Sequence, residues 1–351
     1  MYILPVNSLS PGMTLYEDVY SNDKILLLKA NTRLTQEKIE FLIEKHIDSV
    51  PLAEPLEVEQ SRYEHLHNNE HFQRFNAIYD DAIASFVKIL RNFDTGLDVN
   101  LNKLISLRDD VLHSVMDGEQ LLDYLYNLMA NQNQITYNHC FNCGLLCYVF
   151  AKWCDFPESD LDTITLCGFS FDVGKIKISD ELLWKQGALT PEELLQMQHH
   201  IHLGYDLLKT KKNLPPHVIS VLIMHHERCD GSGYPAGIKE NRIDPYALLA
   251  GIVDTYEAMT HPRAQRIAMT PFQAIEVFEK QGFHKYGEKN LKIILSRIAN
   301  SYLERRVCLN NGTVCRVTEI HDDMLSKPTV YCNKQYIDLR EHPELTITRM
   351  N

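Results

Sequence analysis

The sequence lacks the marks of a membrane, secreted or nucleic-acid-binding protein. Its 351 residues contain no run of about 18 apolar residues, and its first five residues, MYILP, have neither the basic start nor the apolar core of a signal peptide. Lysine and arginine number 35 against 47 aspartates and glutamates, and the net charge of -12 opposes non-specific binding to nucleic acid or anionic lipid. We expect a cytoplasmic protein with no membrane segment and no nucleic acid polymer as partner. Local cations must hold any anionic ligand.

The cysteines lack the spacing of a disulfide framework. There are nine of them, an odd number scattered through helical segments, which is typical of a reducing compartment. Cys140 and Cys143 form a CxxC beside His139, a pattern that zinc and redox sites also use. With Cys147 they fall at i, i+3 and i+7 on one helical face, and free cysteine behaves as a small buried hydrophobe. We interpret these three cysteines as core residues.

The chain is long enough for two or three domains, and its beginning reads as a small α/β module. Residues 1–52 contain a Pro-Gly turn, a short apolar run at 24–29 and a helix capped by Thr35. The acidic stretch 53–70 has few large apolar residues and is interpreted as a linker.

The middle of the chain, residues 71–303, is predicted to be all helical. Apolar residues recur at three- and four-residue steps from His71 to Phe93, which is typical of an amphipathic helix. Further helices are expected at about 100–116, 119–130 and 134–152. Later helix starts carry a capping residue followed by proline, at Thr190, Asp244 and Thr270.

After about residue 303 the apolar pattern changes to period two. Asn311-Gly312 lies between two alternating segments, and this pair is the strongest short signal for a β-hairpin. Residues 304–351 are therefore predicted to form a small β-rich appendage. The fold class expected is mainly α, with a helical domain between a small α/β module and this appendage.

The stretch from Met224 to Gly237, MHHERCDGSGYPAG, combines metal-ligand chemistry with a rigid loop. His225 and His226 follow an apolar run that is predicted to be a buried helix. Neighbouring helical residues point about 100° apart, so both imidazoles can serve one ion only near a helix end. A pair of hydrogen-bonded core histidines is the alternative, and the flanking Asp-Gly-x-Gly-Tyr-Pro argues against it.

The pattern HHExxDGxGYP resembles the signature of the HD-GYP family, bacterial signalling phosphodiesterases of the HD superfamily. The resemblance covers residues 137–266 and implies an all-helical HD-type bundle with metal-dependent hydrolysis of cyclic di-GMP. Residues 4–20, LPVNSLSPGMTLYEDVY, also resemble a module often found ahead of HD-GYP domains.

The resemblance implies a binuclear metal site whose ligands come from separate helices. Asp172 matches the aspartate that bridges the two metals, and Lys175 matches the lysine that contacts phosphate. Each residue alone has a plainer interpretation: an exposed helical histidine, as we expect for His199 and His202, or a surface ion pair between Asp172 and Lys175. The matched metal ligands are His139, Asp172, His200, His225, His226 and Asp254.

The family's substrate contacts match three further positions, Tyr234, Arg263 and Arg266. Arginine offers a planar fork for phosphate or a guanine edge, and tyrosine offers a face for stacking. Two solvated loop arginines are the alternative. The family's usual Arg-Pro-Tyr is Arg-Ala-Gln here, so this contact departs from the pattern.

The main departure from the family is Phe171, which stands where the first letter of HD requires histidine. A phenyl ring cannot bind a metal, so the first position, metal one, keeps only His139, Asp172 and Asp254. The second position, metal two, keeps its full set: Asp172, His200, His225 and His226.

The expected cofactors are two divalent metal ions, one bound tightly and the second more weakly. Some family members hold a third metal with a glutamate at the position of Ile135, so a trinuclear site is not expected. Mixed imidazole and carboxylate ligands suit iron, manganese or zinc almost equally, and we favour iron or manganese.

Two functions of different classes follow. The first is a cyclic di-GMP phosphodiesterase, of full or impaired activity, in which metal-activated water attacks phosphorus and catalysis depends on Asp172 and Lys175. The second is a degenerate domain that senses a cyclic dinucleotide or docks signalling proteins through its GYP loop. Phe171 favours the second function, and the complete metal-two set favours the first. Another nucleotide phosphohydrolase of the HD superfamily is a third possibility, against which the GYP loop argues.

Overall fold

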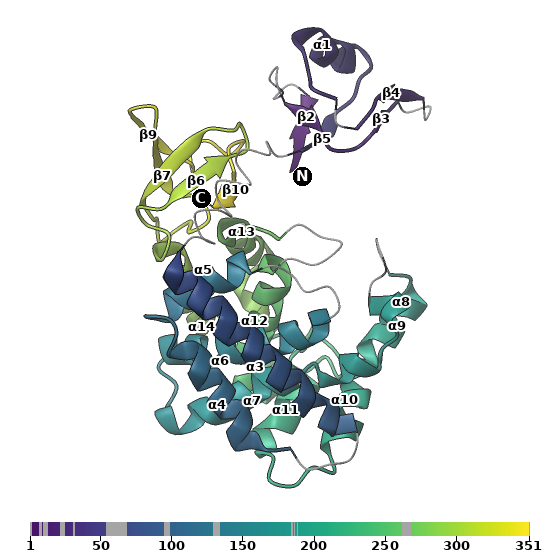
Figure 1. Ribbon diagram of the computed structural model, residues 1–351, viewed down its shortest axis with the longest axis vertical. Coiled ribbons are helices and arrows are strands. Elements are labelled where there is room, and N and C mark those ends of the chain that lie inside the picture. Colours follow the sequence, from purple (N-terminus) through teal and green to yellow (C-terminus); the bar gives the residue numbers. More distant parts are fainter. Residues whose placement is uncertain are drawn as a thin grey trace. The chain divides into compact units, whose positions relative to one another are not determined.

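The computed structural model describes residues 2–6, 9, 13–21, 25–30, 32–53, 69–94, 99–128, 134–183, 185, 187, 189–261 and 268–350 (Figure 1). The chain divides into two compact units. One comprises His71–Tyr302 and Asp322–Ser326, and the other comprises Met1–Glu70, Leu303–His321 and Lys327–Asn351. The expected linker lies almost entirely outside the described residues, and the four-segment division made from the sequence stays a prediction.

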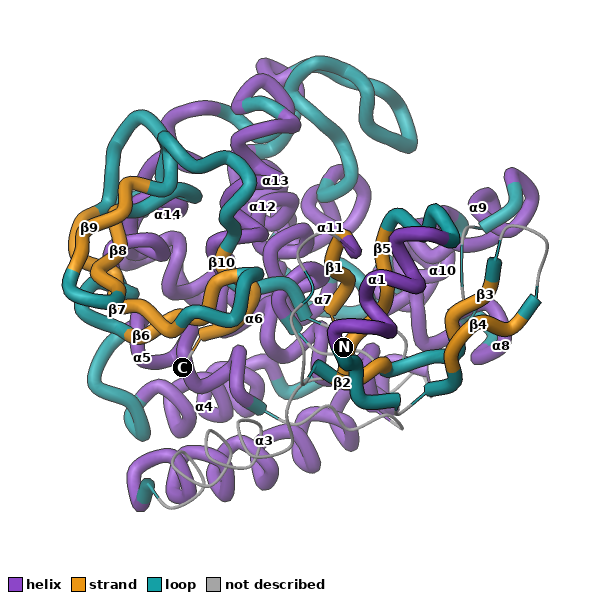
Figure 2. Tube along the Cα trace, turned by 90° about the horizontal axis from the view of Figure 1, so that it is seen from above, coloured by secondary structure: helices purple, strands orange, loops and turns teal. Residues whose placement is uncertain are grey.

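The unit that begins at His71 is all helical, as predicted, and its helices are coloured purple in Figure 2. The helices are α3 (Glu70–Asp94), α4 (Leu101–Leu112), α5 (Gly118–Asn127), α6 (Ile135–Trp153), α7 (Leu161–Ser170), α8 (Asp180–Leu183), α9 (Pro191–Gln198), α10 (His200–Leu208), α11 (Pro216–Met224), α12 (Pro245–Thr260), α13 (Pro271–Gln281) and α14 (Glu288–Asn300). Short 3-10 helices are η3 (Glu158–Asp160), η4 (Val173–Lys177), η5 (Glu240–Arg242) and η6 (Phe283–Lys285).

The amphipathic helix predicted at 71–93 is α3, and its apolar face builds an aromatic core with α6 and α7. Phe86 lies 5.1 Å, between ring centroids, from both Phe141 of α6 and Phe169 of α7. The rings of Phe141 and Phe169 are stacked at 5.4 Å. All three rings are fully buried. Burying a phenylalanine stabilises the fold by about 1.5–3 kcal/mol, so this cluster anchors the two helices that carry the first site residues.

The predicted helix starts are confirmed at Thr190, Asp244 and Thr270. Thr190 and Thr270 each form a capping box, in which the threonine side chain accepts from the backbone three residues on, and that residue's side chain accepts in return. The Asp244 side chain accepts from the Tyr246 backbone at 2.9 Å. A proline follows each cap. The N–H group that proline lacks would have no partner in the first turn of a helix, so its absence costs no hydrogen bond.

One close backbone approach brings η4 against α10. A Cβ atom on Gly174 would lie 1.9 Å from the His200 carbonyl oxygen and 2.5 Å from the Gly204 nitrogen. Only glycine at 174 therefore allows the turn after Asp172 to lie against the start of α10.

In the other unit, the N-terminal residues form a small α/β module, as predicted. Its three-stranded antiparallel sheet has the order β1-β5-β2, its second sheet pairs β3 with β4, and its helix is capped by Thr35. A small apolar core, which includes Leu15, Leu42 and Val50, holds them together. The elements are β1 (Tyr2–Pro5), β2 (Thr14–Leu15), β3 (Val19–Tyr20), β4 (Leu26–Leu28), α1 (Gln36–Glu44) and β5 (Ser49–Ala53).

The C-terminal residues form a five-stranded antiparallel sheet of order β10-β6-β7-β8-β9. The predicted Asn-Gly hairpin is confirmed: it joins β6 to β7, and Gly312 takes a φ of +82° that favours glycine. The strands are β6 (Arg306–Leu309), β7 (Val314–Glu319), β8 (Thr329–Cys332), β9 (Gln335–Asp338) and β10 (Ile347–Met350).

The expectation that every cysteine is reduced is wrong at one pair. Cys315 of β7 and Cys332 of β8 form a disulfide. The two cysteines are 17 residues apart in sequence. The strand register pairs Arg316 with Tyr331 and thereby places the Cα atoms of Cys315 and Cys332 4.6 Å apart. Sheet register made this pair, and sequence spacing did not reveal it. The CxxC cysteines are buried and free, which confirms their interpretation as core residues.

Candidate metal centre

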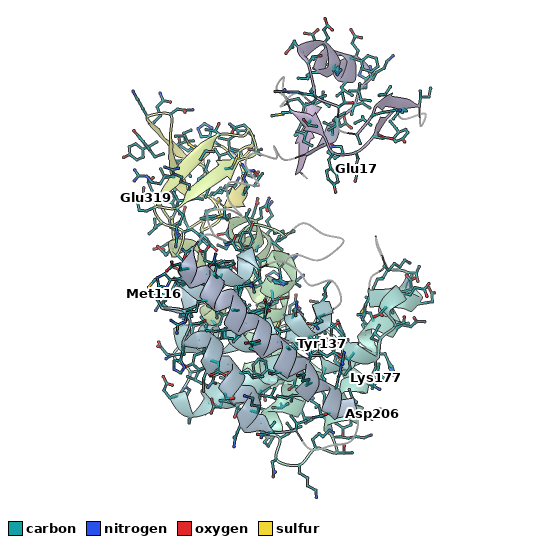
Figure 3. The ribbon with its side chains drawn as sticks, viewed as in Figure 1. Glu17, Met116, Tyr137, Lys177, Asp206 and Glu319 are labelled. Atoms are coloured by element: carbon teal, nitrogen blue, oxygen red, sulfur yellow. A yellow bond between two sulfur atoms is a disulfide. The ribbon has the colours of Figure 1, made fainter. Side chains whose placement is uncertain are left out.

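The six predicted metal ligands come from five segments that meet inside the helical unit. Five of these side chains are buried, and His226 is 13% exposed. Figure 3 labels Tyr137 and Lys177, which lie two residues before His139 and five residues after Asp172 in the chain. The segments are α6 with His139, the α7–η4 junction with Asp172, the start of α10 with His200, the end of α11 with His225 and His226, and α12 with Asp254.

The first group gathers around one oxygen of Asp172. His200 Nε2 lies 3.3 Å and His225 Nε2 lies 3.4 Å from Asp172 Oδ1. A ligand atom of His226 completes the group, in which all candidate atoms lie within 4.8 Å of one another. As predicted, His225 and His226 lie at the end of α11, where His225 is the C-cap.

The backbone determines which nitrogen of these imidazoles carries the proton. His200 Nδ1 donates to the Met197 carbonyl at 2.7 Å, and His225 Nδ1 donates to the Leu222 carbonyl at 3.0 Å. A carbonyl can only accept, so each Nδ1 bears the hydrogen and each Nε2 presents a lone pair in the neutral ring.

Three buried atoms are consequently left without a hydrogen-bond partner: Asp172 Oδ1, His200 Nε2 and His225 Nε2. Burial lowers the pKa of His200 to about 4, and the pKa of Asp172 is also lowered despite its burial, because Lys175 and the imidazoles around it favour the carboxylate. Three electron-rich atoms thus face one another with no proton between them. Such an arrangement is costly by itself and fits a divalent cation.

The second group gathers around His139 Nε2. This atom lies 3.0 Å from Asp172 Oδ2 and 3.2 Å from Asp254 Oδ1, and the three residues form another group that can hold a metal ion. Asp172 offers one oxygen to each group, the arrangement of a bridging carboxylate. This group has one imidazole and two carboxylates, whereas the first group has three imidazoles and one carboxylate.

Phe171 fills the position beside both groups. Its ring is fully buried, stacks on His225 with centroids 4.7 Å apart and meets the edge of His139 at 6.1 Å. The phenyl ring contributes packing and no donor atom. The departure identified in the sequence lies beside both groups, and the loss of a ligand from the second group stays a prediction.

Lys175 lies at the exposed side of the site. Its ammonium donates to Asp172 Oδ2, and its side chain is 19% exposed. The positive charge of Lys175 is the largest of the contributions that lower the pKa of Asp172. An ammonium in this place can contact both the bridging carboxylate and an anion that enters from solvent.

The GYP loop stands over His226. Tyr234 stacks on His226 with ring centroids 4.5 Å apart, and its backbone N–H donates to the His226 carbonyl at 3.2 Å. Gly233 permits this approach, since a Cβ there would lie 2.4 Å from the His226 oxygen. The loop thereby places an aromatic face next to the metal groups.

Comparisons with known proteins agree with this geometry. Residues 123–289 match the family model of the HD domain. A solved structure, Bd1817, described as a HDG"Y"P protein from Bdellovibrio bacteriovorus, superimposes with a TM-score of 0.52 at 18% identity and covers 85% of this chain and 99% of its own. Residues 123–289 are thus similar to HD domains, and the chain shares its fold with a structure described as an HDG"Y"P protein.

Curated relatives that are similar to this chain are named as cyclic dinucleotide phosphodiesterases. A cyclic di-GMP phosphodiesterase from Thermotoga maritima is 34% identical over 190 residues, 54% of this chain and 50% of the relative. One from Pseudomonas aeruginosa is 26% identical over 249 residues, 71% of this chain and 60% of the relative. A 3'3'-cGAMP-specific phosphodiesterase from Vibrio cholerae is 27% identical over 197 residues, 56% and 36% of the two chains. The chain thus spans 60% or less of the length of these relatives.

Two of the predicted substrate residues, Arg263 and Arg266, lie outside the described residues. His199 and His202, expected to be exposed helical residues, are exposed and stack on each other. No helix among the residues that the structure describes combines the length and apolar character needed to cross a bilayer.

Two buried acids that position the site residues, Glu227 and Glu257, were not identified from the sequence. Glu227 is buried and accepts from the Ala236 and Ile238 backbones at 2.7 and 3.1 Å, so this acid of the HHE motif ties the GYP loop down. Glu257 accepts from His139 Nδ1. A signal for Glu257 did exist: it lies three residues after Asp254 on α12, hence near it on the helix surface.

Proposed function

We propose that this chain is a metal-dependent phosphodiesterase that hydrolyses a cyclic dinucleotide, with cyclic di-GMP as the first candidate. The observation that carries the proposal is the set of three buried, proton-free atoms on Asp172, His200 and His225. Without a bound cation, these buried atoms without partners would lower the stability of the folded chain, and no interaction would compensate. The substrate class is supported by the names of the relatives from Thermotoga maritima, Pseudomonas aeruginosa and Vibrio cholerae.

The two groups around Asp172 would hold the metals. Metal two would take Asp172 Oδ1 and the imidazoles of the α10 and α11 histidines, and metal one would take Asp172 Oδ2, His139 and Asp254. When bound, divalent ions supply Lewis acidity that activates water and neutralises phosphoryl charge. Imidazole and carboxylate ligands suit iron or manganese, with zinc also accommodated.

The chain's own residues position the substrate. Lys175, partly exposed beside the bridging carboxylate, would hold a phosphoryl oxygen by a charge-assisted hydrogen bond. One face of the Tyr234 ring is stacked on His226, and the other face would stack on a guanine base. Because the net charge is -12, affinity for a dianionic ligand must come from such local contacts.

A binding module is the second candidate, and Phe171 is the observation that favours it. With a phenyl ring at this position, metal one has a single imidazole, so the second ion is held more weakly than the first. A chain that binds only metal two would retain the ligand without turning it over. We expect slow hydrolysis that depends on added metal.

Metal content and turnover, measured together on the purified chain, test the proposal. The chain should contain about one equivalent of iron or manganese as isolated, and it should hydrolyse cyclic di-GMP when that metal is added. Lys175→Ala should bind metal but lose turnover, whereas Lys177→Ala, the matched change two residues later in η4, should keep it. Metal-loaded protein that binds cyclic di-GMP without hydrolysing it would establish the binding module, and protein that binds no metal would refute both candidates.

A further inference from the structure

Glu257 is a buried acid whose carboxylate is turned toward α6. It is 2% exposed and lies on α12, one helical turn after Asp254. One carboxylate oxygen, Oε2, accepts from His139 Nδ1, on the opposite side of the imidazole ring from the metal-one group. The acid therefore contacts a candidate metal ligand without taking part in either ligand group around Asp172.

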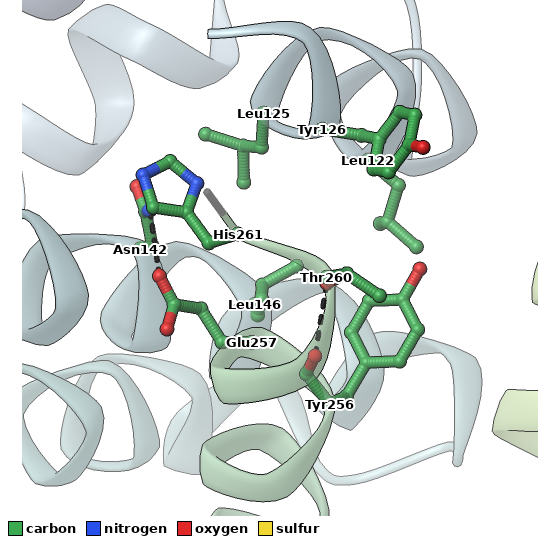
Figure 4. A pocket seen from close by; sticks show the side chains of 9 residues that line it. All are labelled: Leu122, Leu125, Tyr126, Asn142, Leu146, Tyr256, Glu257, Thr260 and His261. Atoms are coloured by element: carbon green, nitrogen blue, oxygen red, sulfur yellow. Dashed lines mark hydrogen bonds between the residues drawn. The ribbon is translucent and has the colours of Figure 1, made fainter. Parts of the chain in front are cut away.

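A chain of buried hydrogen bonds holds Glu257 in this orientation. Asn142 Nδ2 donates to Glu257 Oε1 at 3.0 Å, and the Tyr79 hydroxyl donates to Asn142 Oδ1 at 2.7 Å. Asn142 is 1% exposed and Tyr79 is 5% exposed. Figure 4 shows the Asn142 bond to Glu257 at the edge of a small cavity between α5, α6 and α12. Because both oxygens of Glu257 accept from donors, the network suits the ionised carboxylate.

We propose that Glu257 is the positioning residue of metal one, acting through His139. By accepting the Nδ1 proton it leaves the Nε2 lone pair pointing at Asp172 Oδ2 and Asp254 Oδ1, and its charge strengthens the imidazole as a donor. Phe171 has removed the other imidazole, so metal one depends on His139 and hence on Glu257. The inference rests on the proposed function.

A different use of the same atoms must be separated from this one. Glu257, His139 and Cys143 could themselves surround an ion, since their ligand atoms lie within 4.8 Å of one another. The hydrogen bond that Glu257 already shares with His139 argues against that group.

The test is metal binding by the metal-stripped full chain carrying Glu257→Gln. This change keeps the size of the side chain and its ability to accept from His139, but removes the charge. Calorimetric titration with Mn²⁺ alone should show two classes of ion in the parent, and the weaker class should lose about 10- to 100-fold in affinity in the variant while the tighter class is unchanged. Co²⁺ absorption spectra should show the same selective loss. Glu279→Gln, which alters a half-buried acid bonded to Ser326, should change neither class.

The outcomes separate the inference from the function on which it rests. Two classes that are both unchanged, or both lost, in Glu257→Gln would overturn the inference and leave the proposed function standing. A single class in the parent that Glu257→Gln does not affect would overturn it as well. Loss of the weaker class in Cys143→Ala would place the ion in the alternative group and would also overturn it. A parent chain that binds no Mn²⁺ would overturn the proposed function itself.

Discussion

Replacing Phe171 by histidine would return a donor atom to the position where the chain departs from its family. The side chain is fully buried, between the face of His225 and the edge of His139. Imidazole is flat and smaller than phenyl, so it fits without displacing either neighbour. On the proposed ligand assignment, the new ring would add a second imidazole to the metal-one group, which has only His139 in the parent.

The size of the effect can be worked out for the chain with and without metal. In the metal-free variant a buried imidazole without a partner costs about 1–3 kcal/mol of unfolding free energy. For a domain of this size each kcal/mol lowers Tm by about 2–4 °C. Free metal ion at 100 times its Kd stabilises the folded chain by about 2.7 kcal/mol. Added metal should therefore restore the Tm of the variant to near the parental value.

The assay is a thermal melt with and without Mn²⁺, followed by metal analysis and cyclic di-GMP turnover. Phe171→His should melt lower than the parent without metal, recover with metal, take up a second equivalent and hydrolyse faster. Phe169→His, two residues earlier and stacked on Phe141, is the matched control: it should be destabilised and should gain no more stability from Mn²⁺ than the parent does. Equal metal content and equal rates in Phe171→His and the parent would refute the reasoning. High parental turnover would then mean that metal one is already complete through another ligand, and absent turnover would favour the binding module.

Three further predictions concern metal two, the loop and pH. His226→Ala should remove most of the bound metal, and His202→Ala should not; unchanged stoichiometric binding in the first variant, by elemental analysis, would show that His226 is not a ligand. Gly233→Ala should weaken cyclic di-GMP binding while leaving metal content intact, because the new Cβ would lie 2.4 Å from the His226 carbonyl oxygen; equal affinity by calorimetry would contradict this. Burial lowers the pKa of His200 from 6.5 to about 4, so the unfolded chain binds more protons between these values and the metal-stripped chain should lose stability as pH falls from about 6.5 to about 4. Denaturant midpoints measured across that range should fall with pH, and midpoints that stay level would rule out a buried neutral His200.

Local patterns in the sequence predicted the fold class and much of the element order. Helix caps at Thr190 and Thr270, the apolar spacing of α3 and the Asn-Gly turn all act over a few residues, so they can be read without knowing the tertiary structure. The residues proposed as metal ligands came from the resemblance to the HD-GYP family, since a family motif records the order of residues along the chain. Their roles as ligands stay predictions until metal binding is measured.

Tertiary structure decided what surrounds those residues. Glu257 bonds His139 across 118 positions, and Asn142 bonds Glu257 across 115, so no local spacing could reveal the network. The Cys315–Cys332 disulfide likewise depends on the register of two strands.

What the sequence by itself determined is which side chains carry donor atoms, including the loss of one at Phe171. What only the tertiary structure decided is which nitrogen of His200 and His225 faces the site, because the backbone carbonyls of Met197 and Leu222 accept the Nδ1 hydrogen and leave Nε2 facing the site. The physical reason is that hydrogen bonds and lone pairs are directional over about 3 Å, whereas the sequence specifies neither direction nor distance between helices.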